Sequence, residues 1–484
     1  MNGDDTAGRL EACRETLEAI AADRTLLDAL PETSRRALLE AAGRVTHPIK
    51  AELRAAAKKR HRAKKREKRA RDEAILSSTG IRKGRTATMY ETPPALPPTL
   101  PESVEAPQLG EERKCYICKT RFRETHRFYD SMCVPCGELN YERRFQSADL
   151  SGRVAIVTGA RVKIGYQAAI KLLRAGAEVI VTTRFAHDAA ARYAREEDFE
   201  DWRGRLSIYG LDLRHTPSVE RFCAHVRETR DRLDFLLNNA CQTVRRPAGF
   251  YRHLLEGEQT AQLPAEARSL LEGHEALVRE EATLPDAAAL AQVALLPEDV
   301  GRDLRLFPAG QLDLDGQQVD LRGRNSWRLA LDEVSTVELL EVQLVNAIAP
   351  YVLNGRLRAL MQQTPERDKH IVNVSAMEGQ FYRRFKTDRH PHTNMAKAAL
   401  NMMTRTSAAD YLADGIHMNS VDTGWITDED PAAIAAAKTE VHGFHPPLDI
   451  VDGAARIVDP IFQGFLTGEH AYGLFLKDYQ PVPW

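Results

Sequence analysis

Four cysteines stand in two matched pairs. Cys115 and Cys118 are separated by two residues, and after fourteen further residues Cys133 and Cys136 repeat that spacing. Two intervening residues let both thiolates of a pair reach one ion, and four soft sulfur ligands favour tetrahedral Zn²⁺. A redox CxxC is the alternative, but it needs one reactive pair at the start of a helix rather than two equal pairs. We therefore expect all four to hold a structural zinc ion, with His126 outside the ligand set.

A second group of residues is suited to binding phosphate. The apolar segment VAIVTG ends at Gly159 and leads through Arg161, Lys163 and Ile164 to Gly165, where a helical pattern begins. A glycine-containing turn between a strand and a helix is where a Rossmann unit binds the phosphates of a dinucleotide. The spacing therefore predicts a nucleotide site at this turn.

Alternating segments from Leu150 onward would position that turn. Strand-like segments such as EVIVTT, HIVNVSA and HMNSVDTG alternate with helical stretches such as QAAIKLLRAG. This order predicts an α/β fold, with a doubly wound parallel sheet covered by helices on both faces. Residues 246–325 interrupt the rhythm and predict an insertion of helices with a small hairpin at Asp315 and Gly316. We expect the insertion to cover the ligand cleft or to form the interface of a homo-oligomer.

The chain before this domain divides into three predicted regions. Residues 1–75 are helical and end in a basic helix, 50–71, that has almost no apolar stripe. Residues 76–110 form a proline-rich linker, 111–147 a zinc-ribbon-like module, and 148–484 the Rossmann-type domain. The basic helix is either a solvated charged surface or a contact for a protein or nucleic-acid partner, and the sequence leaves these alternatives open.

Several motifs accompany the phosphate turn at the expected strand ends. Asn238-Asn239-Ala240 and Asn373-Val374-Ser375 end two strand-like segments, Lys397 lies in a helical stretch, and Thr423-Gly424 follows a further strand. Together these motifs resemble the short-chain dehydrogenase/reductase family, over residues 150–484 apart from the insertion. The ending from Tyr472 to Asp478 resembles its retinol-dehydrogenase-like branch. The resemblance implies a Rossmann-type fold, a nicotinamide cofactor and oxidoreductase activity on a small molecule.

The resemblance also implies which residues contact the cofactor. Arg184 stands where NAD-selective relatives carry an acid, and with Arg161 it offers cations for a 2′-phosphate, which favours NADP(H). Lys163 replaces the middle glycine of the phosphate turn, so its side chain must point away from the pyrophosphate or reach round to it. The implied cofactor-binding residues are Gly159, Arg161, Lys163, Ile164, Gly165, Arg184, Asp212, Leu213, Asn239, Ala240, Lys397, Thr423, Gly424 and Ile426.

The family's Asn, Ser, Tyr and Lys catalytic set is only half matched. Asn346 and Lys397 match its first and last members, but Ala376 occupies the serine position and Thr393 the tyrosine position. A threonine hydroxyl is a far poorer acid than a phenol, so the standard proton transfer is in doubt.

Other groups near these positions offer a substitute acid. Glu378, Tyr382, His390 and His392 lie close in the sequence; a histidine has the best-matched pKa, and Tyr382 has the chemistry of the lost group. We favour an NADP(H)-dependent oxidoreductase of a carbonyl or alcohol with a non-standard proton donor. The alternatives are an inactive nucleotide-binding scaffold, or a redox sensor whose zinc module and basic helix bind a protein or nucleic acid.

Composition sets the outer bounds of these predictions. The 484 residues are too many for one ordinary core, and the net charge of -2 excludes a uniformly basic nucleic-acid binder. A mean hydropathy of -0.41 and the lack of an uninterrupted apolar run of 18 residues predict no membrane-spanning helix. Seven cysteines, an odd number, fit a reducing compartment, so we expect a cytoplasmic protein.

Overall fold

The computed structural model describes residues 3–48, 50–97, 107–260, 263–281, 285–300, 305–382 and 386–484. The chain forms two compact units, Met1–Ala74 and Ile75–Trp484. The first unit is helical as predicted, with α1 (Gly3–Ala22), η1 (Arg24–Ala29), α2 (Glu32–Thr46) and most of α3 (Lys50–Ser77). Its side chains are almost all exposed, so this unit has little core of its own.

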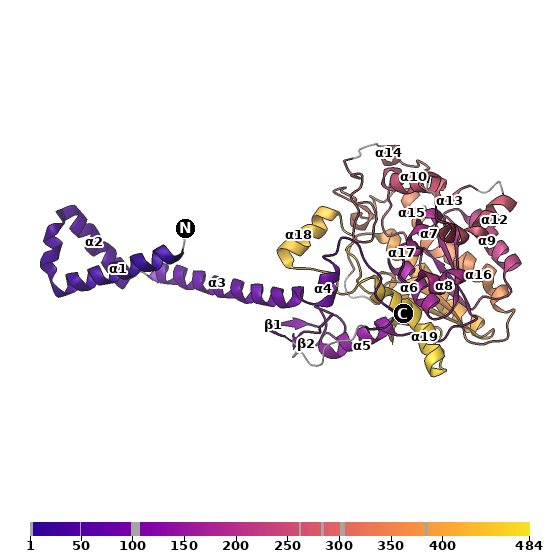
Figure 1. Ribbon diagram of the computed structural model, residues 1–484, viewed down its shortest axis with the longest axis horizontal. Helices are drawn as coiled ribbons and strands as arrows, with labels where there is room; N and C mark the ends of the chain where they lie inside the picture. The colour runs from indigo at the N-terminus through magenta and orange to yellow at the C-terminus, as the bar shows by residue number, and fades with distance from the viewer. Residues whose placement is uncertain are drawn as a thin grey trace. The chain divides into compact units, whose positions relative to one another are not determined.

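An eight-stranded sheet forms the centre of the second unit (Figure 1). Its strand order is β10-β9-β8-β7-β6-β3-β4-β5, and every pair is parallel except β9 with β10. The strands β3 and β4 are largely apolar and buried, as expected for a parallel sheet covered on both faces, and β7 and β8 are fully buried although they mix apolar with polar residues. The chain order reverses at β3, and such a switch point is where ligands bind in doubly wound folds. The strands are β3 (Val154–Thr158), β4 (Glu178–Thr183), β5 (Leu206–Gly210), β6 (Phe235–Asn238), β7 (Lys369–Ser375), β8 (Ile416–Asp422), β9 (Phe475–Lys477) and β10 (Gln480–Val482).

Helices bury one apolar core on each face of this sheet. On one face α6 (Lys163–Arg174), α7 (Ala186–Tyr193) and α19 (Ile450–Thr467) pack on the strands, and a short turn of helix, α8 (Phe199–Trp202) with η2 (Arg203–Arg205), follows α7. On the other face lie α9 (Thr216–Thr229), α16 (Ala349–Met361) and α17 (Pro391–Leu412). The predicted doubly wound α/β fold is thereby confirmed.

The sequence predicts no helix that could span a membrane, but one helical run in the structure is long and apolar enough to do so. The run Thr336–Met361, made of α15 (Thr336–Gln343), η5 (Leu344–Ile348) and α16, is long and apolar enough by length and composition. Leu353 and Leu357 of α16 are fully buried in the domain core against α9. Leu340, Ile348 and Tyr351 of the same run are exposed, so only part of its apolar surface packs inside the Rossmann-type domain.

The interruption of the sheet contains short helices and one hairpin-like turn. A single bridge joins Leu312 to Gln318 across a turn at Asp315 and Gly316, where Gly316 has a φ of 66°. The helices of this interruption are η3 (Ala248–Tyr251), α10 (Arg252–Thr260), α11 (Ala265–Ser269), α12 (Glu272–Glu280), α13 (Ala287–Leu290), α14 (Pro297–Val300) and η4 (Ser326–Arg328). In Figure 1, α10, α13 and α14 lie at the top of the domain and α12 lies at its right-hand side. The short helix η6 (Met377–Gly379) follows β7, and α18 (Ala432–His442) follows β8.

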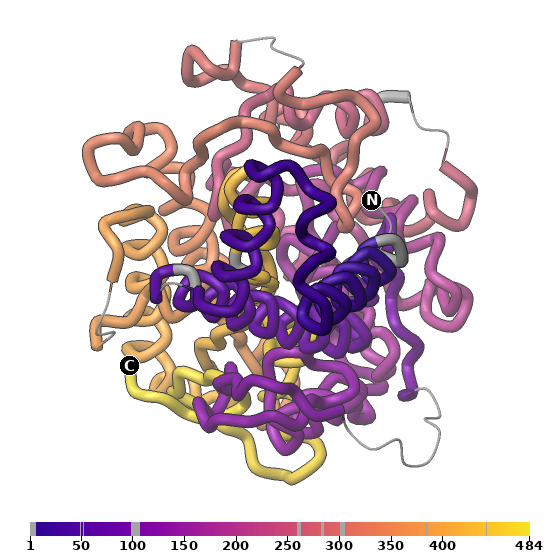
Figure 2. The backbone as a smooth tube through the Cα atoms, turned by 90° about the vertical axis from the view of Figure 1, so that its left-hand side faces the viewer, coloured from indigo at the N-terminus to yellow at the C-terminus, as the bar shows by residue number. Residues whose placement is uncertain are grey.

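The cysteine-containing module is continuous with the Rossmann-type domain. It comprises α4 (Gly80–Gly84), β1 (Gln108–Lys114), β2 (Arg121–Glu124) and α5 (Val134–Phe145). Figures 1 and 2 both show this purple segment beside the yellow C-terminal segment that carries α19. One apolar cluster contains residues of both, so the module predicted as a separate domain over 111–147 shares its core with the Rossmann-type domain.

The predicted bounds of the proline-rich linker, 76–110, are wrong at both ends. Leu76 and Ile81 are buried in the core of the module, and β1 already begins at Gln108. Between them the chain is extended but docked, because the Tyr90 hydroxyl donates to Asp449 at 3.2 Å. Proline removes backbone donors, but it leaves side chains and carbonyls free to bind a neighbouring surface. Residues 98–106 of the predicted linker lie outside the described residues.

Candidate cofactor and metal sites

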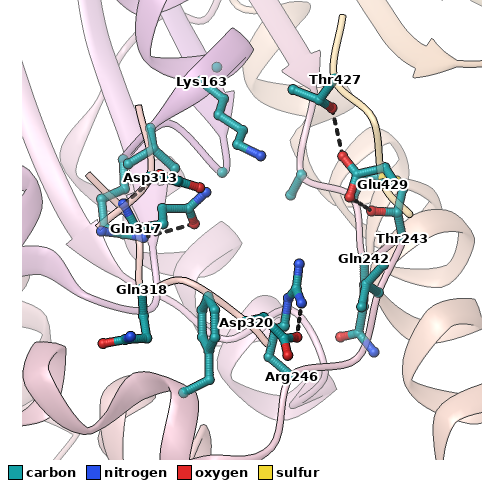
Figure 3. Close-up of a pocket in the computed structure, with 18 of the residues that line it drawn as sticks. Lys163, Gln242, Thr243, Arg246, Asp313, Gln317, Gln318, Asp320, Thr427 and Glu429 are labelled. Atoms are coloured by element: carbon teal, nitrogen blue, oxygen red, sulfur yellow. Dashed lines mark hydrogen bonds and ion pairs between the residues drawn. The ribbon is translucent and has the colours of Figure 1, made fainter. Parts of the chain in front are cut away.

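A cavity of 590 Å³ lies at the carboxyl edge of the sheet. Its wall comes from the turn after β3, the ends of β4, β5 and β6, the loop after β8, and the insertion. In Figure 3, Lys163 and Asp313 lie on one side, Glu429 and Thr427 on the other. The insertion therefore covers the cleft, which was one of its two expected roles. The predicted cofactor residues in the lining are Gly159, Arg161, Lys163, Ile164, Gly165, Arg184, Asp212, Leu213, Asn239, Ala240 and Ile426.

The glycines of the turn are required by close backbone packing. Gly159 has a φ of 67°, and a Cβ there would lie 2.8 Å from the Cα of Ala240. A Cβ on Gly165 would lie 2.3 Å from Nδ2 of Asn239. That amide nitrogen donates to the carbonyl oxygens of Thr158 at 3.0 Å and Gly159 at 3.2 Å. Asn239 therefore holds the turn in the shape that a phosphate cradle needs.

Lys163 takes up the backbone conformation of the glycine it replaces. Its φ is 59°, in the left-handed region that L residues rarely adopt. Its side chain points into the cavity (Figure 3), and Nζ lies 3.8 Å from Oδ2 of Asp315. Burial lowers the pKa of Lys163, but the carboxylates of Glu429, Asp315 and Asp313 raise it above its ordinary value. The lysine therefore stays charged and available to a phosphate.

The two arginines that the sequence predicts for the 2′-phosphate have different partners. Arg184 lines the cavity, donates to the Tyr251 hydroxyl at 2.8 Å, and lies 4.6 Å from the centroid of that ring. Arg161 instead pairs with Asp188 at 2.6 Å. Because that guanidinium is already neutralised, Arg161 is a weaker 2′-phosphate ligand than the sequence suggested. Asp212 is likewise engaged, accepting from Nη2 of Arg214 at 2.6 Å.

Sequence reasoning missed several polar groups of the cavity. Glu429 accepts from the Thr427 hydroxyl at 2.6 Å and from Thr243 at 3.5 Å. Burial raises the pKa of Glu429, but Lys163 lowers it below its ordinary value, so the carboxylate is ionised. The sequence offered one indication of Glu429, because this residue lies between two aspartates in the loop after β8. The lining residues of the insertion, among them Arg246, Asp313, Gln317 and Asp320, carried no such signal.

Asn346 supports the cavity through the backbone of another residue. Its Oδ1 accepts from the Gln242 backbone N–H at 2.7 Å, and its Nδ2 donates to the Gln242 carbonyl at 3.0 Å. The residue lies in the π-helical turn η5, where an extra residue per turn changes the direction in which the side chains point. Gln242 lines the cavity, so Asn346 fixes the wall where β6 ends.

The other matched catalytic positions lie deeper. Lys397 is 4% exposed and donates from Nζ to the Val374 carbonyl at 2.7 Å. Thr393 is 2% exposed, and within the described part of the chain its hydroxyl has no hydrogen-bond partner; the same is true of Ser375. Neither Lys397 nor Thr393 is among the described lining residues. Thr423 and Gly424, two predicted cofactor ligands, are also not among the described lining residues.

The predicted substitute acids do not line the described cavity either. Tyr382 is 49% exposed. His392 is buried, with Nε2 3.7 Å from Oε1 of Glu338, and burial lowers its pKa to about 4. The ring of His390 stacks on Trp327 at a centroid distance of 3.9 Å, and burial lowers its pKa. These histidines are neutral near pH 7 and packed, which removes the reason for preferring them as acids.

The four cysteines converge as their spacing predicts. All four Sγ atoms lie within 4.8 Å of one another, and those of Cys118 and Cys133 are 3.6 Å apart. A tetrahedral Zn²⁺ with bonds of about 2.3 Å requires sulfurs about 3.8 Å apart, so the quartet fits this ion. His126 lies outside the quartet; its Nδ1 accepts from the backbone N–H groups of Phe128 at 3.1 Å and Tyr129 at 3.2 Å.

Comparisons with known proteins agree with this geometry. A family model described as short chain dehydrogenase matches residues 153–255, and a model described as enoyl-(acyl carrier protein) reductase matches 326–446. The stretch between the two matches belongs to the insertion, which accounts for the break.

Three similar proteins illustrate how sequence identity and coverage vary among the matches. The uncharacterized protein R665 of Acanthamoeba polyphaga mimivirus is 31% identical over 366 residues, which cover 72% of this chain and 71% of that protein. Human retinol dehydrogenase 13 is 36% identical over 95 residues, which cover only 19% of this chain and 28% of that protein. A solved NADPH-bound carbonyl reductase from chicken fatty liver is 16% identical, covers 69% of this chain and 100% of that chain, and has a TM-score of 0.43. With the matched motifs and the strand order, the family models show that the chain belongs to the short-chain dehydrogenase/reductase family.

Proposed function

We propose that this protein is an NADP(H)-dependent oxidoreductase that interconverts a carbonyl and an alcohol. The observation that carries the proposal is the cavity in which the phosphate turn, Lys163 and Arg184 face one space at the switch point of the sheet. When bound, the nicotinamide supplies or accepts a hydride, which is the hard chemical step. The chain's own residues bind and orient the cofactor and handle the proton.

The preference for a 2′-phosphate rests on the end of β4. A carboxylate at this position would accept hydrogen bonds from the two ribose hydroxyls of NAD and repel the 2′-phosphate of NADP. The residue here is Arg184, whose planar guanidinium donates to phosphate oxygens in pairs. Its contact with Tyr251 holds it at the cavity wall before any ligand arrives. Lys163 is proposed to bind the pyrophosphate.

Proton handling in this proposal differs from the family pattern. Ala376 has no hydroxyl and Thr393 is a poor acid, so neither replaces the serine and tyrosine. Lys397 keeps its buried place on α17, and its charge favours an anion formed beside it. We propose that the donor is a non-standard group reached in the cofactor complex.

An inactive nucleotide-binding scaffold is the second candidate. It is favoured by the same two positions, Ala376 and Thr393, and by the fact that neither Tyr382 nor His392 is among the described lining residues. Both candidates bind NADP(H), so binding alone does not separate them. Isothermal calorimetry with NADPH and NADH tests the shared part, and turnover on a panel of aldehydes, ketones, enones and quinones separates the two.

We further propose that the cysteine quartet holds one structural zinc ion. Four thiolates fill the tetrahedron and leave no open position for catalysis. Elemental analysis of the purified full-length protein should find about one zinc per chain. Zinc that survives intact in the double variant Cys133→Ser, Cys136→Ser would overturn this assignment.

A further inference from the structure

We infer that the cysteine module is a working part of the cofactor site, and that Tyr116 is a positioning residue for the cavity wall. The inference rests on the proposed binding of NADP(H) and zinc and adds a coupling between them. Tyr116 lies between the ligands Cys115 and Cys118, so the metal fixes its backbone. Its side chain reaches the loop that follows β8.

A shared apolar cluster joins the two sites. Cys115, Phe122 and Met132 of the module pack in one cluster with Ile426 and Ile450 of the Rossmann-type domain. Ile426 and Ile450 also line the cofactor cavity. The packed residues behind this part of the cavity wall therefore belong to the module.

A direct polar contact joins Tyr116 to the loop. The Trp425 backbone N–H donates to the Tyr116 hydroxyl at 3.0 Å. The neighbouring Gly424 has a φ of 80°, and a Cβ there would lie 3.2 Å from that hydroxyl and 2.6 Å from Leu448. The hydroxyl thus occupies the space beside the glycine, and it holds the backbone immediately before Ile426.

Buried charges fasten the other side of the module to α19. Arg144 on α5 pairs with Asp449 at 2.6 Å and with Asp452 at 3.1 Å. The Tyr129 hydroxyl donates to Asp452 at 2.5 Å. These contacts hold the first turn of α19, which carries Ile450 of the cavity wall. Because the four cysteines follow β1 and begin α5, removing the ion releases the end of β1 and the start of α5, and so loosens both supports.

Such an arrangement has a thermodynamic consequence. If the metal-bound module favours the wall geometry that binds the cofactor, the cofactor must in turn favour the metal-bound module by the same factor. We expect zinc removal to weaken NADPH binding about 10-fold, and saturating NADPH to retain zinc against a chelator by an equal factor in equilibrium affinity.

The first test needs no cofactor. Hydrogen exchange of peptides spanning Trp425 should be about 3- to 10-fold faster in Tyr116→Phe than in the wild type, the range for one lost hydrogen bond. Tyr141→Phe is the matched control, because Tyr141 belongs to the same cluster but lies on α5. Zinc content should stay at the wild-type level in both variants.

The second test measures binding. NADPH should bind Tyr116→Phe about 3- to 10-fold more weakly than the wild type, and Tyr141→Phe should equal the wild type. Unchanged exchange at Trp425 in both Tyr116→Phe and zinc-stripped protein would overturn the inference, as would equal weakening in the two variants. A wild-type protein that binds no NADPH would refute the proposed function alone, because the exchange result still decides whether Tyr116 holds the loop.

A separate observation carries a second inference, in the first unit. We infer that α3 is a binding surface for the phosphate backbone of nucleic acid. Between residues 53 and 71 the helix carries eleven Lys and Arg and a single acid, and every side chain is exposed. Residues 53–71 therefore carry a net charge of +10. Because the whole chain has a net charge of -2, the rest of the chain carries -12, and the excess of positive charge is concentrated in this one helix.

The distribution of these cations selects the partner. At about 100° per residue they cover about three quarters of the helix circumference, and alanines with Glu67 occupy the rest. A membrane-surface helix needs an apolar face, and a protein partner needs apolar or aromatic anchors; this stretch offers neither. At 1.5 Å per residue it is about 28 Å long, close to one turn of duplex DNA.

Binding of the full chain to a labelled duplex at several salt concentrations tests this inference. With about six phosphates contacted, log K should fall with log salt at a slope of about -5. Lys58→Gln with Lys59→Gln and Lys64→Gln should reduce affinity at least 10-fold and flatten the slope, while Arg203→Gln with Arg279→Gln should not. Absent or salt-independent binding, or stronger binding to phosphatidylserine vesicles than to the duplex, would overturn it.

Discussion

Replacement of Arg184 by alanine is the most informative change at the nucleotide site. A hydrogen bond to a charged group contributes about 1.5 to 3 kcal/mol. Arg184 is only half-buried, so solvent screening reduces the gain to the lower part of that range. About 1.5 to 2 kcal/mol corresponds to a 10- to 30-fold weaker affinity for NADPH.

The affinity for NADH is the control for the affinity for NADPH. NADH lacks the 2′-phosphate, so its affinity should stay within about two-fold of the wild type in Arg184→Ala. Tyr251→Phe removes only the hydroxyl that orients the guanidinium, and should weaken NADPH binding by about 0.5 to 1.5 kcal/mol. Calorimetric titration of each variant with both cofactors measures these values. An Arg184→Ala variant that loses both cofactors equally, or neither, would refute the assignment of the 2′-phosphate to this residue.

Three further predictions concern the turn and the buried histidines. Gly165→Ala should abolish cofactor binding measured by calorimetry, because the new Cβ would lie 2.3 Å from Asn239; normal affinity would show that the turn can shift. Lys163→Gly should leave the melting temperature unchanged or higher, since it relieves a φ of 59°, yet weaken NADPH binding; equal affinity would mean that the lysine does not reach the phosphates. Burial lowers the pKa of His392 to about 4 and that of His370 well below its ordinary value. As the pH drops below about 6.5, these histidines therefore take up protons in the unfolded chain before they do so in the folded protein. The free energy of unfolding should fall over this pH range. Urea midpoints between pH 7.5 and 4.5 measure this loss, His392→Gln should reduce it, and midpoints that stay constant would contradict it.

Local patterns were sufficient for the scaffold and for two of its sites. The strand, turn and helix around Gly159 follow from a short apolar run and glycines that the backbone packing requires. The cysteine spacing likewise predicted the convergence of four sulfurs, because each pair is set by a short segment.

The remaining features depend on contacts between distant segments. Arg161 was expected to bind phosphate, but Asp188, 27 residues further along, already pairs with it. The insertion fills the cavity wall through residues such as Asp320, whose pairing with Arg246 follows from tertiary packing and not from any periodic pattern. The cysteine module, 111–147, was predicted as a domain distinct from the Rossmann-type domain that begins at residue 148. In the structure its core is shared with the domain that follows.

The catalytic positions show a different limit. The sequence predicts that Thr393 and Ala376 lack the required acid, but it could not show that Lys397 donates a hydrogen bond to the Val374 carbonyl. Nor could it show that His392 is buried and neutral near pH 7. Burial and pKa depend on the packing of α15 and α17 against each other, which no single segment determines.

Hydride transfer itself is the most direct test of the proposed activity. NADPH carrying deuterium at the transferable position of the nicotinamide is incubated with the full-length protein and the carbonyl panel, and the products are analysed by mass spectrometry. The proposal predicts one deuterium in at least one alcohol product, and loss of that label with Lys397→Ala. Bound NADPH with no deuterium in any product, under conditions where a standard family member labels its substrate, would contradict the oxidoreductase and leave the nucleotide-binding scaffold.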